Sequence, residues 1–355
     1  MGCQQSQMAQ TKYINSQVVD KSFNGKLKVI QKDQEIFILH NTQTMVKNKD
    51  LIDFVEVLPK IDKLQKFTIA IENQEIESDG LIKCIKWLKS YPQINSLTLM
   101  LKNNEIESSF AQPFRSLIQK LPQLQNLYLD LESNRINSDT FLKLFNGQFA
   151  QNLKYLYLNF RDNDIDDEIN YSMQFLSKSQ IEEITINLEE NQLETETICE
   201  IIQNFSSSLK KINLIFTCVY EGERIFEVLA EQFKVLINLE QLNIESNITR
   251  FEDVEKFILN MNECRSLSTI SLKFKLNLPH EIAVNLIKQS ILAIPSINLD
   301  LQNQQEFGSI NIDQFLGVLK KKNLEQMIDI YRCLLLKKIF QKYNIQLIDW
   351  QSIFI

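Results

Sequence analysis

The chain is poor in the residues from which most catalytic and nucleotide-binding sites are built. Its 355 residues include only 7 glycines, and none stands in a GxGxxG or GxxxxGK[ST] pattern, so the glycine-rich loops that hold phosphate groups are missing. The only histidines, His40 and His280, lie far apart in the sequence, which leaves no Ser/His/Asp or Cys/His constellation. We therefore expect a protein that is not an enzyme, without catalytic residues and without a cofactor.

Cysteines are also few and scattered. The 6 cysteines include no CxxC pair, and none has a histidine at the spacing of zinc ligands, so we expect neither disulfides nor a metal site. The acidic stretch Asp162 to Glu168 resembles a calcium loop only in part, because it lacks the required glycine and has Met173 where an EF-hand has glutamate. Reduced core cysteines are typical of an intracellular protein.

Long apolar runs and long basic runs are both absent. No segment reaches the roughly 18 apolar residues of a membrane-spanning helix, and the polar N-terminal stretch lacks the apolar region of a secretory signal. The formal net charge is -7, and no basic run is interleaved with aromatic residues, which argues against nucleic acid as a partner. The acidic surplus favours cationic or neutral partners.

The chain does contain a repeated pattern of apolar residues. It is clearest in Leu121 to Ile136, LPQLQNLYLDLESNRI, where leucines at 124, 127, 129 and 131 precede Asn134 and Ile136. The frame recurs about every 27 to 30 residues. Five successive units fit it, beginning at Leu64, Ile94, Leu124, Leu153 and Ile181. Four later units keep the apolar positions and lose parts of the rest, beginning at Leu209, Leu239, Leu267 and Ile294.

Each unit predicts a strand followed by a helix. The alternation L-x-L-x-L has the period of two that buries every second side chain of a strand. Apolar residues then recur at helical spacing in Ser78 to Leu88, Ser138 to Phe149 and Thr195 to Phe205, and the first residue of each segment stands where a helix N-cap is expected. Equal units of this kind stack into a parallel sheet with helices outside it. We therefore predict an α/β solenoid.

A polar amide occupies one fixed place just after the strands, at Asn104, Asn134, Asn163 and Asn191. Such an amide can satisfy backbone groups that the turn leaves unpaired, and stacked copies would form a ladder. We interpret these asparagines as structural, since a catalytic residue would not recur in several repeats. Other units hold Gln74, Val219, Thr249 and Gln304 at this place. We expect looser turns there.

These features resemble leucine-rich repeat proteins of the ribonuclease-inhibitor-like subfamily, in particular the L-x-x-L-x-L-x-L-x-x-N-x-I type abundant in ciliates. The resemblance covers Glu35 to Leu336 and implies a horseshoe-shaped solenoid with a parallel inner sheet, outer helices and about nine or ten repeats. In this chain the first leucine lies farther from the asparagine than in the common form, so we expect strands about two residues longer. The frame is specific to the fold and not to a function.

The N-terminal part differs in composition from the repeats. Residues 1–32 are polar and lack periodicity apart from one short strand near Leu27 to Ile30, which is typical of a flexible tether. Residues 33–60 contain a predicted strand at Glu35 to Leu39 and a predicted helix at Asp50 to Leu58. These two elements would form an N-terminal cap over the core of the first repeat.

The repeats are predicted to occupy residues 61–320, and the frame weakens toward their end. Residues 321–355 would hold a C-terminal repeat and cap, with an amphipathic helix from Cys333 to Tyr343. The alternative for this helix is a role in binding a partner.

The first residues, MGCQQS, match a lipidation pattern. After removal of Met1, Gly2 becomes the N-terminus, and Ser6 supplies the hydroxyl of the myristoylation pattern M-G-x-x-x-[ST]. The start is similar to that of dually acylated signalling proteins that begin MGC, which implies myristate on Gly2 and palmitate on Cys3. One myristoyl chain gives only marginal membrane binding, and a second makes it stable. The alternative is a chance MG start.

Residues between the inward leucines face the concave side of the solenoid, where repeat proteins usually bind. Tyr128 and Tyr157 hold the same position in consecutive repeats, and Asp130, Asn159 and Arg161 flank them. Tyrosine and arginine dominate binding hot spots, so we predict that these five residues contact a protein partner. The alternative is that both tyrosines are present because tyrosine favours strands.

These observations predict a non-enzymatic scaffold for protein–protein interaction, held by acyl groups on the cytoplasmic face of a membrane. Its partners would be a protein on the concave face and the membrane itself, and we expect a monomer. A second interpretation is a regulator of a signalling enzyme, of the inhibitor or GTPase-activating type, as some members of the resembled subfamily are. An enzyme in its own right is disfavoured, because no catalytic constellation occurs.

Overall fold

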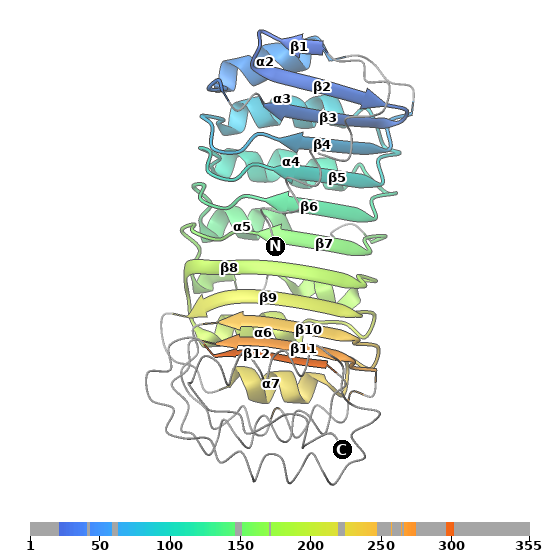
Figure 1. Cartoon of the computed structure of the whole chain (residues 1–355), viewed down its shortest axis with the longest axis vertical. Helices are drawn as coiled ribbons and strands as arrows, with labels where there is room; N and C mark the ends of the chain where they lie inside the picture. The colour runs from blue at the N-terminus through green and yellow to red at the C-terminus, as the bar shows by residue number, and fades with distance from the viewer. Residues whose placement is uncertain are drawn as a thin grey trace, which may run out of the picture.

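The described residues form a single sheet of twelve strands, which follow one another in chain order. In Figure 1 they are stacked along the long axis, with the helices behind them. The computed structural model describes residues 21–40, 43–58, 63–145, 151–169, 172–218, 224–246, 257, 264, 266–274 and 296–301. Within these ranges no helix has the length and apolar character needed to cross a membrane.

The polarity of the strands divides the sheet into an antiparallel hairpin and a parallel array. β1 pairs antiparallel with β2 and β2 antiparallel with β3, whereas each later pair is parallel and in register. The strands are β1 (Lys21–Phe23), β2 (Leu27–Lys32), β3 (Glu35–His40), β4 (Lys66–Ala70), β5 (Ser96–Met100), β6 (Asn126–Asp130), β7 (Tyr155–Asn159), β8 (Glu183–Leu193), β9 (Lys211–Cys218), β10 (Gln241–Ser246), β11 (Thr269–Phe274) and β12 (Ser296–Leu301).

The helices of the described part lie on one face of this sheet (Figure 1). They are α2 (Asn48–Glu56), α3 (Ser78–Leu88), α4 (Ala111–Ile118), α5 (Ser138–Phe145), α6 (Thr195–Gln203) and α7 (Ile225–Gln232), with the 3-10 helices η1 (Ser108–Phe110), η2 (Asp167–Ile169) and η3 (Gln174–Lys178). Between β7 and β8 the described residues contain η2 and η3 in place of an α-helix, and the buried Ile169 and Leu176 still fill the layer there.

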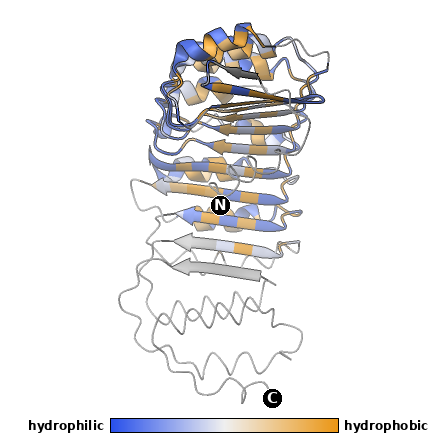
Figure 2. Cartoon of the chain, turned by 45° about the horizontal axis from the view of Figure 1, so that its top comes forward, coloured by the Kyte–Doolittle hydropathy of each residue, from blue (hydrophilic) through white to orange (hydrophobic). Residues whose placement is uncertain are grey.

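One continuous hydrophobic core lies between the sheet and the helices. The inward residues Leu127, Leu129 and Leu131 of one unit are at most 2% exposed. Figure 2 shows the resulting alternation of hydrophobic and hydrophilic residues along the strands. Burying one leucine side chain contributes about 1.5 to 3 kcal/mol, so each buried position of the recurring frame stabilises its unit. The predicted α/β solenoid with parallel strands is therefore confirmed.

The helix starts differ from the prediction in one respect. Ser78 is not an N-cap but the first residue of α3, and Glu77 precedes it as the cap. The buried Ser78 hydroxyl instead accepts from the Glu107 N–H (2.9 Å) and donates to the Glu107 carbonyl (3.2 Å). Ser138 makes the same link, accepting from the Asp166 N–H at 2.7 Å. These hydroxyls join one repeat to the next.

The predicted tether is too long at its C-terminal end. Within residues 1–32, the described positions from Lys21 onward belong to the sheet as β1 and β2. Asn24 and Gly25 have positive φ angles of 52° and 67°, as hairpin turns require, and the Asn-Gly pair there is a strong hairpin signal that the polar composition concealed.

The extra residues of the repeat frame lengthen a turn and not the strand. Leu124 lies ahead of β6, where its N–H donates to the Leu121 carbonyl at 3.1 Å and its side chain is fully buried. The strands β4 to β7 are each 5 residues long. The expectation of longer strands is therefore wrong for this part of the array.

The asparagine ladder has the structural role that we predicted. The Asn163 amide nitrogen donates to the carbonyls of Leu131 (2.9 Å), Phe160 (3.1 Å) and Arg161 (3.0 Å), while its oxygen accepts from the Ile136 N–H (3.0 Å). Asn104, Asn134 and Asn191 bond in the same way. Each side chain thus joins its own turn to the preceding repeat.

Glutamine replaces asparagine in the first unit without loosening the turn. The Gln74 oxygen accepts from the Val46 N–H at 2.6 Å, and its nitrogen donates to the carbonyls of Glu72 (3.2 Å) and Asn73 (2.7 Å). The expectation of a looser turn is therefore wrong here. The corresponding Val219, Thr249 and Gln304 lie outside the described residues, as do Gly2, Cys3, His280 and the predicted elements of 302–355.

Candidate protein-binding face

The sheet face turned away from the helices, here called the open face, carries side chains in rows. Because the parallel strands are in register, equivalent residues of successive repeats stand side by side. One row consists of Thr68, Thr98, Tyr128, Tyr157, Thr185, Asn213 and Asn243. The next consists of Ala70, Met100, Asp130, Asn159, Asn187, Ile215 and Glu245.

Tyr128 and Tyr157 form a stacked pair at the middle of the described sheet. Their strands β6 and β7 place them directly opposite one another, the ring centroids are 3.9 Å apart, and the ring planes differ by 4°. Each side chain is half-buried. Their hydroxyls share a hydrogen bond, and burial raises the pKa of both phenols above the ordinary value. The pair is thus a fixed aromatic surface that loses little conformational freedom on binding.

Asp130 and Asn159 lie beside this pair and hold one another in place. They are the next outward residues of β6 and β7, and the Asn159 amide donates to Asp130 Oδ1 at 3.1 Å. Asp130 Oδ1 also accepts from the Glu132 N–H at 3.1 Å, and Asn159 donates to Glu132 Oε2 at 3.0 Å. Only 7% of Asp130 and 3% of Asn159 is exposed. They therefore support the surface more than they form it.

Several carboxyl groups lie near the stacked tyrosines. Burial raises the pKa of Asp130 to about 6, and the carboxylates of Glu132 and Glu72 add to this, although the hydrogen bonds from the Glu132 N–H and from Asn159 oppose it. Burial likewise raises the pKa of Glu72, against the opposing charges of Lys102 and His40. The neighbouring carboxyl groups thus disfavour the ionisation of Asp130 and of Glu72.

Two cations lie at the margin of this group, and both are paired. The Lys102 ammonium is 2.8 Å from Glu132 Oε1, which raises the pKa of Lys102. The Arg161 guanidinium contacts Glu190 and lies 3.4 Å from Glu189 Oε2. An arginine that already pairs with two carboxylates gains less binding free energy from a partner than an unpaired one, because its existing ion pairs must first be broken.

The structure therefore brings together the five residues that we predicted as a patch, with unequal exposure. Tyr128 and Tyr157 are half-buried, Asp130 and Asn159 lie beside them and are almost fully buried, and the Arg161 N–H donates to Asn159 Oδ1 at 3.2 Å. The three charged neighbours that complete the patch were not predicted: Glu72, Lys102 and Glu132. They stand one place after the last inward residue of each strand, and the alternation of charge at that place in consecutive repeats was the available signal.

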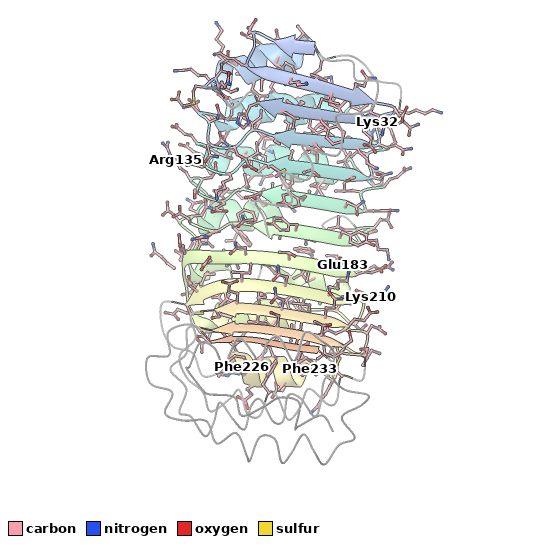
Figure 3. All side chains as sticks on the ribbon, viewed as in Figure 1. Lys32, Arg135, Glu183, Lys210, Phe226 and Phe233 are labelled. Carbon is pink, nitrogen blue, oxygen red and sulfur yellow. The ribbon has the colours of Figure 1, made fainter. Side chains whose placement is uncertain are left out.

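Charged side chains also line the two edges of the sheet at which the strands begin and end. Figure 3 shows Arg135 at one edge and Glu183 and Lys210 at the opposite edge, where the strands begin. Arg135 lies 3.0 Å from Glu107 Oε1, and Lys210 lies 2.7 Å from Glu182 Oε2. These pairs are accessible to solvent, which screens their charges, so they contribute little to stability. The edges are solvated, so the stacked tyrosines remain the most distinctive feature of the face.

The described residues contain no group of three or more His, Cys, Asp or Glu side chains that could hold a metal ion. What the arrangement can do chemically is bind, through aromatic surface, amide groups and negative charge. Cys84 and Cys199 do not alter this, because burial raises the pKa of both thiols, to about 12 for Cys199, and a buried thiol of this kind is not a nucleophile.

Comparisons with known proteins give structural neighbours only. No known family's sequence profile matches the chain, and no curated protein matches it. A solved protein from Bacteroides fragilis is 16% identical over 73% of this chain and 71% of its own, with a TM-score of 0.42. An internalin from Listeria monocytogenes is 16% identical over 75% of this chain and 85% of its own, with a TM-score of 0.26. The likeness to leucine-rich repeat proteins therefore rests on the strand, turn and helix geometry described above.

Proposed function

We propose that the protein is a non-enzymatic scaffold that binds a protein partner on the open face of its sheet. The observation that carries this proposal is the stacked pair of Tyr128 and Tyr157, 3.9 Å apart and half-buried on a face that the described helices leave uncovered. Rigid aromatic side chains of this kind anchor protein interfaces, because they bury a large area at a small cost in side-chain entropy.

The proposal extends to the shape of the array. We infer a horseshoe-shaped solenoid of about nine or ten repeats, of the ribonuclease-inhibitor-like type with the asparagine frame that is abundant in ciliates. The open face is then the concave one. Support comes from the α-helices that follow β4, β5 and β6, because a helix is wider than a strand and spreads the outer side of the stack.

A purification of partners from cell extract tests the scaffold. The full chain is immobilised as wild type and as the double variant Tyr128→Ala/Tyr157→Ala, and the recovered proteins are compared by quantitative mass spectrometry. We expect the double variant to lose specific partners, because hot-spot tyrosines contribute about 2 kcal/mol or more each, which is roughly thirtyfold in affinity.

The matched control is Val57→Ala, which removes apolar surface at the helix layer. Val57 is 62% exposed and is the C-cap residue of α2, one of the helices on the face of the sheet opposite the open face. Recovery of partners should survive this change. If the double tyrosine variant recovers the same proteins as the wild type, the open face is not the binding surface and the proposal fails.

The proposed location is the cytoplasmic side of a membrane, with the protein held peripherally as a monomer by acyl groups on Gly2 and Cys3. Two chains are proposed because one myristoyl group alone gives only reversible binding. Fractionation of cells that express the wild type, Gly2→Ala and Cys3→Ser, together with labelling by an alkyne analogue of myristate, tests this. Label and membrane association should both disappear in Gly2→Ala, and equal association of all three proteins would contradict the tether.

The alternative function is regulation of a signalling enzyme, as an inhibitor or a GTPase-activating protein. The two functions differ in their effect on the partner. A pure scaffold leaves the catalytic rate of the recovered partner unchanged when the repeat protein is added, whereas a regulator alters that rate in proportion to the occupancy of the open face.

A further inference from the structure

We propose that the open face takes a basic side chain of the protein partner, with its cation against the outer ring face of Tyr128 and within reach of Glu72 and Asp130. This inference rests on the proposed function, since it names the partner chemistry for the same face. It goes further by committing to one position on that face and to one sign of charge.

The geometry leaves one face of each tyrosine ring for a ligand. With ring planes only 4° apart and centroids 3.9 Å apart, the inner face of each ring is covered by the other ring. The outer face of Tyr128 is directed toward β5, where Thr98 is the opposing residue, and the outer face of Tyr157 is directed toward β8, where Thr185 is. A threonine side chain is much shorter than a tyrosine, so it covers only the part of the ring that lies nearest the sheet.

Charge distinguishes the two outer faces. Asp130 and Glu72 act on the phenols of both tyrosines, but Glu72 follows β4, on the side toward which the outer face of Tyr128 is directed. The nearest cation there, Lys102, is already paired with Glu132. On the other side, Asn187 is the residue of β8 that opposes Asn159, and it is neutral. The Tyr128 side is therefore the one at which an added cation is favoured.

The balance of formal charge around this position is negative. The groups that face it are the carboxyls of Glu72, Asp130 and Glu132, the ammonium of Lys102, and His40, which faces Glu72. Three carboxylates and one ammonium leave a formal net charge of -2 before His40 is counted, and of at least -1 with it. The nearest arginine, that of Arg161, is held by Glu189 and Glu190 of the next repeat.

Arginine fits this position better than lysine. A guanidinium is planar and stacks on an aromatic ring, while its edge donates to carboxylates. It is also less strongly hydrated than an ammonium, which lowers the cost of placing it on a half-buried surface. Asp130 is almost fully buried and carries a carboxyl whose ionisation its surroundings disfavour, and an approaching cation relieves that disadvantage.

The test uses two small probes that differ in charge and hardly in shape, N-acetyl-arginine amide and N-acetyl-citrulline amide. Each is titrated into the isotope-labelled full chain, and the amide signals of Tyr128, Asp130 and Met100 are followed by NMR. We expect saturable shifts with the arginine probe and an affinity at least about tenfold weaker for citrulline, as for the loss of one charge-assisted hydrogen bond.

A matched pair of variants locates the cation. Thr98→Phe covers the outer face of Tyr128, and Thr185→Phe covers the outer face of Tyr157, by the same change at equivalent positions of two strands. Phenylalanine favours strands, so both variants keep the sheet. Thr98→Phe should abolish the arginine shifts and Thr185→Phe should leave them unchanged. Asp130→Asn should weaken the arginine probe about tenfold while keeping the shape of the side chain.

The outcomes separate this inference from the proposed function. Equal binding of both probes, insensitivity to Thr98→Phe and Asp130→Asn, or no saturable binding of the arginine probe overturns the basic-side-chain inference. The scaffold proposal still stands in that case if partner recovery depends on the two tyrosines. If recovery does not depend on them, the proposed function fails, and with it the inference that rests on it.

Discussion

Replacing Asn163 by alanine is expected to destabilise the array by an amount that can be worked out from its hydrogen bonds. Its nitrogen donates to three carbonyls, but those of Phe160 and Arg161 also accept from the Asn191 amide and from the Ser133 N–H. The groups left without a hydrogen bond are the Leu131 carbonyl and the Ile136 N–H. Each buried group that loses its partner costs about 1 to 3 kcal/mol, so the variant should lose about 2 to 6 kcal/mol.

Asn134 provides the matched comparison within the same ladder. Its nitrogen donates to the Leu101 carbonyl, which also accepts from Asn104, and to the Glu132 carbonyl, which also accepts from a backbone N–H. Only the Ile106 N–H would lose its partner. Asn134→Ala should therefore cost about 1 to 3 kcal/mol, roughly half as much as Asn163→Ala.

The assay combines urea unfolding, followed by circular dichroism, with hydrogen exchange at single amides. We expect the urea midpoint to fall from wild type to Asn134→Ala and to fall further in Asn163→Ala. Exchange at the Ile136 N–H should become faster only in Asn163→Ala. Equal midpoints for the two variants, or unchanged protection of Ile136 in Asn163→Ala, would refute the reasoning that counts orphaned backbone groups.

Three further predictions concern a glycine, a carboxylate and a thiol. A Cβ on Gly80 would come within 2.4 Å of Asn48 Oδ1, which accepts from the Gly80 N–H at 2.7 Å. Gly80→Ala should therefore destabilise the fold by about 1 to 2 kcal/mol in thermal unfolding, and the loss should be smaller once Asn48 is alanine, when the remaining close contacts are the Asn48 carbonyl and Leu51 Cδ2, each 3.3 Å from the added Cβ. An equal destabilising effect in both backgrounds would exclude the Asn48 side chain as the cause. Because the pKa of Asp130 is raised in the folded state from 3.8 to about 6, the folded protein binds the extra proton, so wild-type stability should increase as the pH falls from about 6 to about 4. Asp130→Asn should be more stable than wild type by up to about 2 to 3 kcal/mol at pH 7.5 in urea unfolding and should lose that advantage below pH 4, whereas a constant difference across this range would show that the charge is not responsible. Burial raises the pKa of the Cys199 thiol to about 12, so peptide mass spectrometry should find it unalkylated by iodoacetamide at pH 8.5 until urea unfolds the protein. Alkylation of Cys199 in the native protein at a rate close to that in urea would contradict its burial.

The strands and most helix positions were predictable because the pattern that specifies them is local. Every second residue of a strand is buried and every third or fourth residue of a helix, and both periods can be read within one repeat. The helix from Ser78 to Leu88 was predicted with the bounds that the structure has. The Tyr128 and Tyr157 pair was also predictable, since it needs only equal positions in two consecutive repeats.

The remaining features depend on contacts between residues in different repeats. Serine is a residue type that often forms helix N-caps, but the Ser78 hydroxyl accepts a hydrogen bond from Glu107 in the next repeat. Arginine is a residue type that often forms binding hot spots, but Arg161 is paired with two carboxylates of the next repeat, about 28 residues further along the chain. The register of the turns decides these contacts, and apolar periodicity carries no information about polar residues beyond the strand.

The antiparallel hairpin at the N-terminal end of the sheet has a consequence for self-association. Every strand of a parallel array presents the same row of backbone hydrogen-bonding groups, so an unprotected edge strand is a site at which a second molecule can add a strand. β2 runs against the array and β1 returns to the direction of the array, but β1 pairs with only Leu27, Lys28 and Val29 of β2. A three-residue edge strand offers few backbone groups to a second molecule. The short β1 therefore limits the backbone groups that are open to strand addition at this end of the described sheet.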